Sequence, residues 1–307
     1  MNLENVNTEP FVNLHLFHEH INITIKILTA SLHNTFEIVS SSNDEKELGK
    51  LIAKTDPAWN TPPIWSFSGI SKAQIYGYVS EFGVIGAFSA LDDFFEGVES
   101  EINRWNEKLD EEKKMVPIDG YDKFDEKVLN FYSKYNWKTI EIDKYIPLLK
   151  YFRLVRNCIA HRNCKPSSAL IDYSTSDFLD STFSDNFKNN TIAILPKFKK
   201  EEKVVIDPKL AIFSSHILRC ISEDVNNKLI QFLGQDGVVN MAAHHGFLKE
   251  QPVITDAYKS AEAIFNFILT DRYRVILDNN REASVKAKNI GVWRRCLAQF
   301  EASTRNQ

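Results

Sequence analysis

The stretch LLKYFRLVRNCIAHRN, residues 148–163, decides how the chain is interpreted. Its apolar residues recur at steps of four, three and four, which is the spacing of one face of an α-helix. Lys165-Pro166 follows shortly afterwards and favours an end to the helix. The stretch therefore predicts an apolar helix with polar groups gathered near its C-terminal end. The apolar stripe consists of Leu148, Phe152, Val155 and Ile159.

Two residues of this helix carry chemistry. Arg156 and His161 lie five positions apart. An imidazole can move a proton near neutral pH, and a guanidinium is a permanent cation whose planar fork matches a phosphate. The pair supplies what metal-free cleavage of a phosphodiester needs.

The pattern Arg156-Asn157, three further residues and His161 resembles the signature of the HEPN superfamily of small all-helical domains. In that family the signature is Arg, four to six residues, then His, most often with Asn directly after the Arg. Many members are RNA-cutting toxins or defence effectors. The resemblance covers roughly residues 10 to 233. It implies an all-helical bundle and a homodimer in which two motif helices face each other across a two-fold axis.

The geometry of an ideal helix gives one further expectation. At 100° per residue, Asn157 and His161 lie about 40° apart, whereas Arg156 and His161 differ by about 140°. A straight helix is therefore expected not to aim both side chains easily at one phosphate. Either the helix distorts near Lys165-Pro166, or a second copy of the chain completes the site, as the resemblance implies.

The resemblance also implies supporting residues. Many HEPN proteins place an acidic side chain on the preceding long helix, close to the motif arginine. Asp92 is the first candidate here and Glu96 the second, each as a group that orients the arginine. The alternative is a pair of solvated carboxylates. Asn157 is expected to hold the imidazole tautomer or to bind phosphate.

Other basic residues are candidates for binding RNA. Arg153 and Arg162 flank the motif and are either phosphate contacts or simple surface charges. A second cluster, with Phe198 inside it, suits single-stranded RNA, because basic groups interleaved with an aromatic ring can hold phosphates and bases. An exposed hairpin tip kept soluble by lysine is the alternative. This cluster consists of Lys197, Lys199, Lys200 and Lys203.

The rest of the chain predicts a mainly helical architecture with a HEPN-like domain over residues 1–233 and a helical appendage over 234–307. Within the first domain we expect a loop at 43–70 and an insertion at 162–207 that carries a small β-hairpin, formed by 191–195 and 203–206. Expected helices span 11–39, 71–114, 123–136 and 208–234, with two more near 256–277 and 282–302. The helix expected at 71–114 carries a sustained stripe of apolar residues: Val84, Phe88, Leu91, Phe95, Val98, Ile102 and Trp105.

Composition narrows the class of protein. In 307 residues, 43% are hydrophobic and 21 are Phe, which is ample for a large core. There is no secretory signal and no apolar run long enough to span a membrane, so a cytoplasmic location is expected. The four cysteines contain no Cys-x-x-Cys pair, and neither His15, His18 and His20 nor His244-His245 has metal-ligand spacing. We therefore expect no metal or other cofactor.

The net charge of −4 argues against a non-specific binder of long duplexes more than against an enzyme that cuts one RNA loop. The sequence thus favours a dimeric HEPN-type endoribonuclease, a toxin or antiviral effector that cuts tRNA or other structured RNA and is restrained by a neutralising partner. Two alternatives stay open. One is a helical dimerisation or scaffold module, and the other is a nucleotide-binding regulator in which Arg156 grips a phosphate that is never cut.

Overall fold

A computed structural model describes residues 1–41, 47–56, 58, 72–120, 126–187, 194–249, 260–279 and 281–305. These residues are mainly α-helical, as predicted. They contain no β-strand and only one isolated antiparallel bridge, between Asn2 and Ile276. Within the same ranges, no helix has the length and apolar character needed to cross a membrane.

Contacts between residues divide the chain into two compact units. Unit 1 comprises Met1–Phe17, Ala90–Asp143 and Arg219–Gln307, and unit 2 comprises His18–Ser89 and Lys144–Leu218. The chain passes from one unit to the other inside each of its long helices, α1 (Glu9–Ser41), α3 (Lys72–Asn106) and α8 (Pro208–Ala243). The division therefore differs from the expected boundary between residues 233 and 234.

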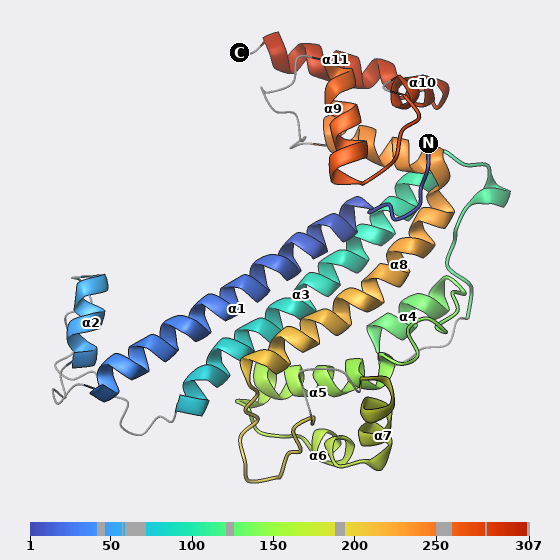
Figure 1. Cartoon of the computed structure of the whole chain (residues 1–307). Coiled ribbons are helices and arrows are strands. Elements are labelled where there is room, and N and C mark those ends of the chain that lie inside the picture. The colour runs from blue at the N-terminus through green and yellow to red at the C-terminus, as the bar shows by residue number, and fades with distance from the viewer. Residues whose placement is uncertain are drawn as a thin grey trace. The chain divides into compact units, whose positions relative to one another are not determined.

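Apolar periodicity explains the long helices. Every member of the predicted stripe on α3, from Val84 to Trp105, is buried. In unit 2, Gly83 lets α1, α3 and α8 run side by side at close range (Figure 1). A Cβ atom at Gly83 would lie 2.6 Å from Cδ1 of Ile25 on α1 and 3.3 Å from Cβ of Ala211 on α8. The helix ends at Asn106, earlier than predicted, and a 3₁₀ turn, η2 (Glu111–Lys113), follows.

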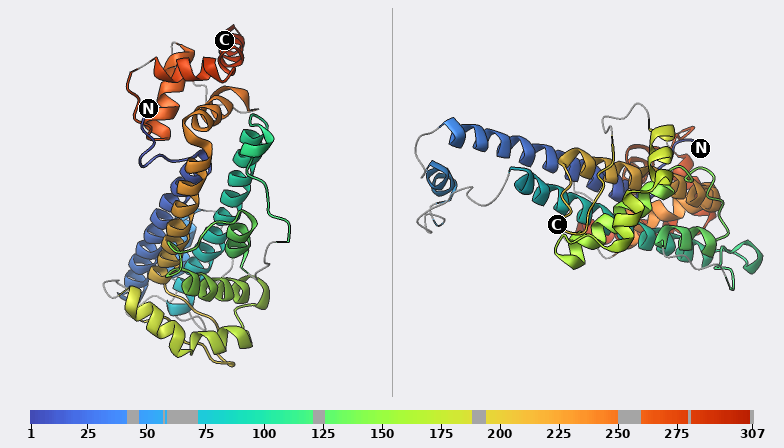
Figure 2. Two further views of the ribbon diagram at one scale, coloured as in Figure 1. Left: turned by 90° about the vertical axis from the view of Figure 1, so that its right-hand side faces the viewer. Right: turned by 90° about the horizontal axis from the view of Figure 1, so that it is seen from below.

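Unit 2 also contains α2 (Glu47–Thr55), α5 (Ile146–Arg162), α6 (Ser168–Ser174) and α7 (Asp177–Asn186). The predicted loop at 43–70 thus contains α2, while most of its other residues lie outside the described ranges. Helices α6 and α7, which contact α5, were not predicted (Figure 2). Each begins at a serine N-cap: the Ser167 hydroxyl accepts a hydrogen bond from the Leu170 N–H, and Ser176 accepts one from the Leu179 N–H.

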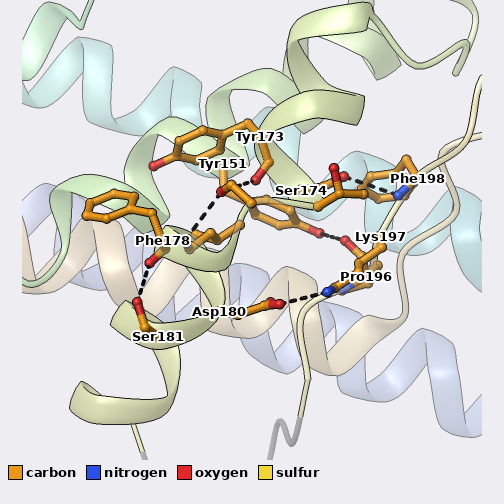
Figure 3. A network of polar contacts seen from close by, with 12 residues as sticks. Tyr151, Tyr173, Ser174, Phe178, Asp180, Ser181, Pro196, Lys197 and Phe198 are labelled. Atoms are coloured by element: carbon orange, nitrogen blue, oxygen red, sulfur yellow. Dashed lines mark hydrogen bonds and ion pairs between the residues drawn. The ribbon is translucent and has the colours of Figure 1, made fainter.

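The predicted β-hairpin is wrong for the described residues 194–206, which form an extended loop without strand pairing; residues 191–193 lie outside the described ranges. Several polar groups of this loop bond to the helices of unit 2 (Figure 3). The Tyr151 hydroxyl donates to the Pro196 carbonyl at 2.9 Å, and the Phe198 N–H donates to the Ser174 hydroxyl at 3.2 Å. Phe198 is buried and stacks on Tyr151, so the loop packs as part of the core.

Unit 1 contains α4 (Lys127–Lys134), within the segment predicted at 123–136. Its C-terminal helices are α9 (Ala261–Phe267), α10 (Glu282–Asn289) and α11 (Trp293–Arg305). Two π-helical segments, η3 (His244–Leu248) and η4 (Ile268–Arg272), follow α8 and α9. The single helix predicted over 282–302 is therefore two helices.

Described residues of the predicted appendage, 234–307, pack with the first residues of the chain. The Glu9 carboxylate, 2% exposed, receives two hydrogen bonds from Arg272, at 2.6 and 2.7 Å. The Asn7 N–H donates to the carbonyl of Tyr273. Gly234, with a positive φ of 57° and non-helical backbone, interrupts α8, so that two helical segments meet there at a kink. These contacts place the C-terminal residues in the same compact unit as the N-terminal ones.

Candidate functional site

The predicted motif lies in the last two turns of α5. The whole apolar stripe of this helix is buried, and Pro147 occupies its first turn, where a missing N–H costs nothing. Asn157 and Arg156 are half-buried, and His161 is exposed. The burial of the stripe fixes the orientation of α5, so the polar residues of the motif are left at the surface of unit 2.

The C-terminal end of α5 is firmly held. Asn163 takes a left-handed conformation, φ 50°, and Cys164 follows with φ 60°. The Cys164 N–H donates to the Cys158 carbonyl at 3.1 Å, and the Cys164 carbonyl accepts from the Val204 N–H at 2.8 Å. Ser167 bonds to the Cys158 sulfur through its N–H at 3.3 Å. The turn after the motif is therefore tied to both the helix and the 194–206 loop.

Arg156 and His161 meet within one chain. The Arg156 NH1 group lies 3.2 Å from Nε2 of His161 and 3.2 Å from Oδ1 of Asn157. The angle between their Cα positions therefore does not keep the two side chains apart, whereas the expectation that one straight helix does not easily aim both at one phosphate stays a prediction. The angle between Cα positions does not limit an arginine, because its long side chain reaches along the helix surface to the next turn.

The contact gives the imidazole nitrogen one role. A guanidinium can only donate hydrogen bonds, so Nε2 of His161 is the acceptor in this contact. Arg156 has no ion pair with a carboxylate in the part of the chain that the structure describes. A basic nitrogen and an uncompensated cation thus lie side by side at the surface of unit 2.

The flanking arginines differ in their surroundings. Arg162 is exposed, and its Nε donates to the Lys165 carbonyl at 3.3 Å. Arg153 is half-buried one turn before Asn157. Neither role predicted for them, phosphate contact or surface charge, is tested by these contacts.

Asp92 and Glu96 lie on the part of α3 that belongs to unit 1, whereas the motif belongs to unit 2. The Asp92 carboxylate accepts a hydrogen bond from Lys127 Nζ at 2.8 Å. Glu96 borders a cavity of ≈ 690 Å³ together with His244 and Arg295. Their predicted role in orienting Arg156 stays a prediction.

The basic cluster at 197–203 is partly compensated by carboxylates. Lys197 Nζ lies 2.7 Å from Oδ2 of Asp180, as Figure 3 shows, and Lys199 lies 3.7 Å from Glu202. Lys200 is exposed. Since Phe198 is buried, it offers no ring for stacking an RNA base. The cluster can therefore contact RNA only through the charges of its exposed lysines.

Two features near the motif were not predicted. The Cys164 thiol donates to Glu81 Oε1 at 3.3 Å. Burial, together with this carboxylate, raises the pKa of the Cys164 thiol to about 11, so the group stays protonated at neutral pH. Tyr151, which anchors the 194–206 loop, is the other. No sequence pattern predicts either contact, because each joins residues far apart in the chain.

Two other histidines have polar partners within the protein. His18 Nδ1 lies 2.5 Å from the Ser215 hydroxyl, and His245 Nε2 lies 2.6 Å from Oε1 of the buried Glu101. Burial, and next the positive charge of Arg104, lowers the pKa of His244 to about 4. Among the residues whose positions are described, no group of three or more side chains is arranged to hold a metal ion.

Comparison with known proteins gives no relative: no family model, no curated protein and no solved structure matches the chain.

Proposed function

We propose that the protein is a metal-independent endoribonuclease of the HEPN type, a toxin or antiviral effector that cuts tRNA or other structured RNA in the cytoplasm. The observation that carries the proposal is the 3.2 Å contact between Arg156 NH1 and His161 Nε2 on an exposed helix end. It supports the view that base and cation act on one phosphodiester.

The proposed reaction begins at the ribose. His161 Nε2 takes the proton of the 2′-hydroxyl, and the 2′-oxygen forms a bond to phosphorus. The bond from phosphorus to the 5′-oxygen breaks, and the leaving 5′-oxygen takes a proton from a second imidazole, that of the partner chain, which enters this step protonated. The products are a 2′,3′-cyclic phosphate and a 5′-hydroxyl. General acid–base help of this kind contributes about a hundred- to ten-thousandfold.

Arg156 neutralises charge on the phosphorane oxygens, where a fixed cation acts most strongly. In the resting site it donates to His161 instead, so substrate phosphate must replace the imidazole as its acceptor. Asn157, at 3.2 Å from the same NH1 group, keeps the guanidinium beside the histidine. The phosphate thereby draws Arg156 away and leaves Nε2 open to the 2′-hydroxyl.

The proposed homodimer provides the second imidazole. One surface of α5 would meet the same surface of another copy, as in most closed dimers. Such an enzyme needs restraint in the cell, and we propose that a neutralising protein partner or a trigger provides it.

The test incubates the purified protein with total RNA in EDTA, beside His161→Ala, Arg156→Ala and a matched control, His33→Ala, which removes an exposed histidine of α1. Cleavage by the parent and by His33→Ala, loss of at least about a hundredfold in the two motif variants, and cyclic phosphate ends are expected. DNA should stay intact because it lacks the 2′-hydroxyl.

Equal cleavage by all four proteins would overturn the proposal. Thermal stabilisation by mononucleotides, lost in Arg156→Ala and without RNA fragments, would instead favour a nucleotide-binding regulator. Light scattering measures the oligomeric state in the same preparations, and a monomer that cuts RNA at full rate would contradict the shared site.

A further inference from the structure

The C-terminal end of unit 1 is a small group of three helices, α9, α10 and α11, that contact one another (Figures 1 and 2). The Phe265 ring of α9 meets the Trp293 ring of α11 edge to face, with centroids 5.9 Å apart. The Ser284 hydroxyl of α10 donates to Glu262 of α9 at 2.5 Å. Buried residues fill the space between the helices: Ala261, Ile264, Ala283, Ala287, Val292 and Cys296.

A tight turn joins α10 to α11. Gly291 has a left-handed φ of 78°, and its N–H donates to the Lys288 carbonyl at 3.0 Å. The Val292 N–H donates to the Ala287 carbonyl, also at 3.0 Å. These two bonds make a Schellman motif, in which glycine at the left-handed position ends one helix and turns the chain sharply. The three residues 290–292 thus separate two helices, the connection of a helix-turn-helix.

Helix α11 presents one polar face to solvent. Trp293 and Cys296 are buried against α9 and α10. Arg294 and Gln299, in the first two turns, are exposed. Arg295 is exposed too and also borders the ≈ 690 Å³ cavity that Glu96 lines. Ala298 lies between these residues on the helix surface. Its small side chain allows another molecule to approach this face closely.

The charge of this region differs from that of the whole chain. Residues 281–305 contain six Lys or Arg and two Glu, although the chain has a net charge of −4. Both carboxylate oxygens of Glu282 have structural partners: Oε2 accepts from the Asp278 N–H at 2.8 Å, and Oε1 accepts from the Met1 ammonium group at 2.6 Å. Glu301, the other carboxylate, is exposed on α11. Lys288 Nζ lies over the Trp293 ring, 5.8 Å from its centroid, beside the turn between α10 and α11. Positive charge is therefore concentrated at the start of α11.

We propose that α10 and α11 form a helix-turn-helix that binds duplex DNA, with α11 in the major groove. Arg294, Arg295 and Gln299 then face base edges, since arginine pairs with guanine and glutamine with adenine there. Lys288 contacts a phosphate beside the groove. DNA is favoured over duplex RNA because the deep, narrow major groove of A-form RNA does not admit a helix. The proposal does not depend on the ribonuclease activity.

The test measures binding of the full chain, in a His161→Ala background that prevents RNA cleavage, to a short fluorescent DNA duplex by anisotropy. The double variant Arg294→Ala/Arg295→Ala should bind at least about tenfold more weakly, and its plot of log affinity against log salt should be shallower by about 2. The matched control is Lys26→Ala/Lys54→Ala, which removes two exposed charges from unit 2 and should bind like the parent.

Circular dichroism checks that each variant folds, and the single charge reversal Arg294→Glu replaces the double variant if that one does not. Three results would overturn the proposal: no binding of the parent up to about 100 µM at low salt, unchanged binding by the α11 variants, or equal affinity for duplex RNA of the same sequence.

Discussion

Substitution of the buried Asn226 by alanine should destabilise unit 1 strongly. The Asn226 side chain is part of α8 and 2% exposed. Its Oδ1 accepts from the N–H of Thr8 at 2.9 Å and from the Thr8 hydroxyl at 2.7 Å, and its Nδ2 donates to the Val6 carbonyl at 2.9 Å. The residue therefore holds the N-terminal segment against α8 by three hydrogen bonds.

The magnitude follows from those three bonds. A hydrogen bond contributes a net of about 1 kcal/mol, and more when its loss leaves a buried partner unsatisfied. Asn226→Ala should thus lower the free energy of unfolding by about 3 kcal/mol. The neighbouring Asn227 is exposed on the same helix, so Asn227→Ala should change stability by less than about 0.5 kcal/mol.

Urea denaturation followed by circular dichroism measures both variants. A fall in the midpoint with an unchanged slope reports lost stability, whereas a changed slope reports a different unfolded or partly folded state. If Asn226→Ala and Asn227→Ala unfold at the same urea concentration as the parent, the network does not hold the N-terminal segment and the reasoning fails.

Three further predictions concern pH, backbone and thiol chemistry. Burial raises the pKa of Glu9 and Glu101, but their partners together outweigh it, chiefly Arg272 and His245 for Glu9 and His245 and Arg104 for Glu101, so both pKa values are lowered from 4.5. The stability that the two groups contribute is present above pH 4.5 and is lost as the pH falls through the lowered values. Urea midpoints across that range should show this loss, and Glu9→Gln should reduce it. Gly291→Ala forces an alanine into a left-handed conformation and should cost about 1 kcal/mol or more in a thermal melt, with an Ala298→Gly variant for comparison. The Cys164 thiol, with its pKa of about 11, should react slowly with iodoacetamide at pH 8, and Glu81→Gln should speed the reaction; an unchanged rate would contradict the role of that carboxylate.

Periodicity predicted the long helices because each has a stripe of apolar side chains that only a helix can bury on one side. The stripe of α3 and that of α5 are examples, and both are buried throughout. The polar residues that mark the ends of helices were less informative. Helices α6 and α7 are short and polar, so the apolar residues Leu170, Leu179 and Phe183 gave no repeat long enough to read, although Ser167 and Ser176 are typical N-caps.

The error of the predicted β-hairpin has a physical cause. The segments 191–195 and 203–206 on either side of 196–200 indicated two strands, but Val204 and Ile206 are buried within unit 2, and an extended loop that packs on helices can bury such residues without a partner strand. The angular argument about Arg156 and His161 treated side chains as directions from the helix axis. The contact that joins them depends on side-chain length, which a helical wheel omits.

The threading of the chain through both units limits how the protein can be taken apart. Of the four passages between units, three lie inside continuous helices, α1, α3 and α8. No single cut in the polypeptide yields unit 2 as a fragment with its helices intact. Each fragment would contain parts of α1, α3 or α8 that lack the residues they pack against. The two units are therefore better studied separately by point substitutions, and truncated fragments are expected to aggregate.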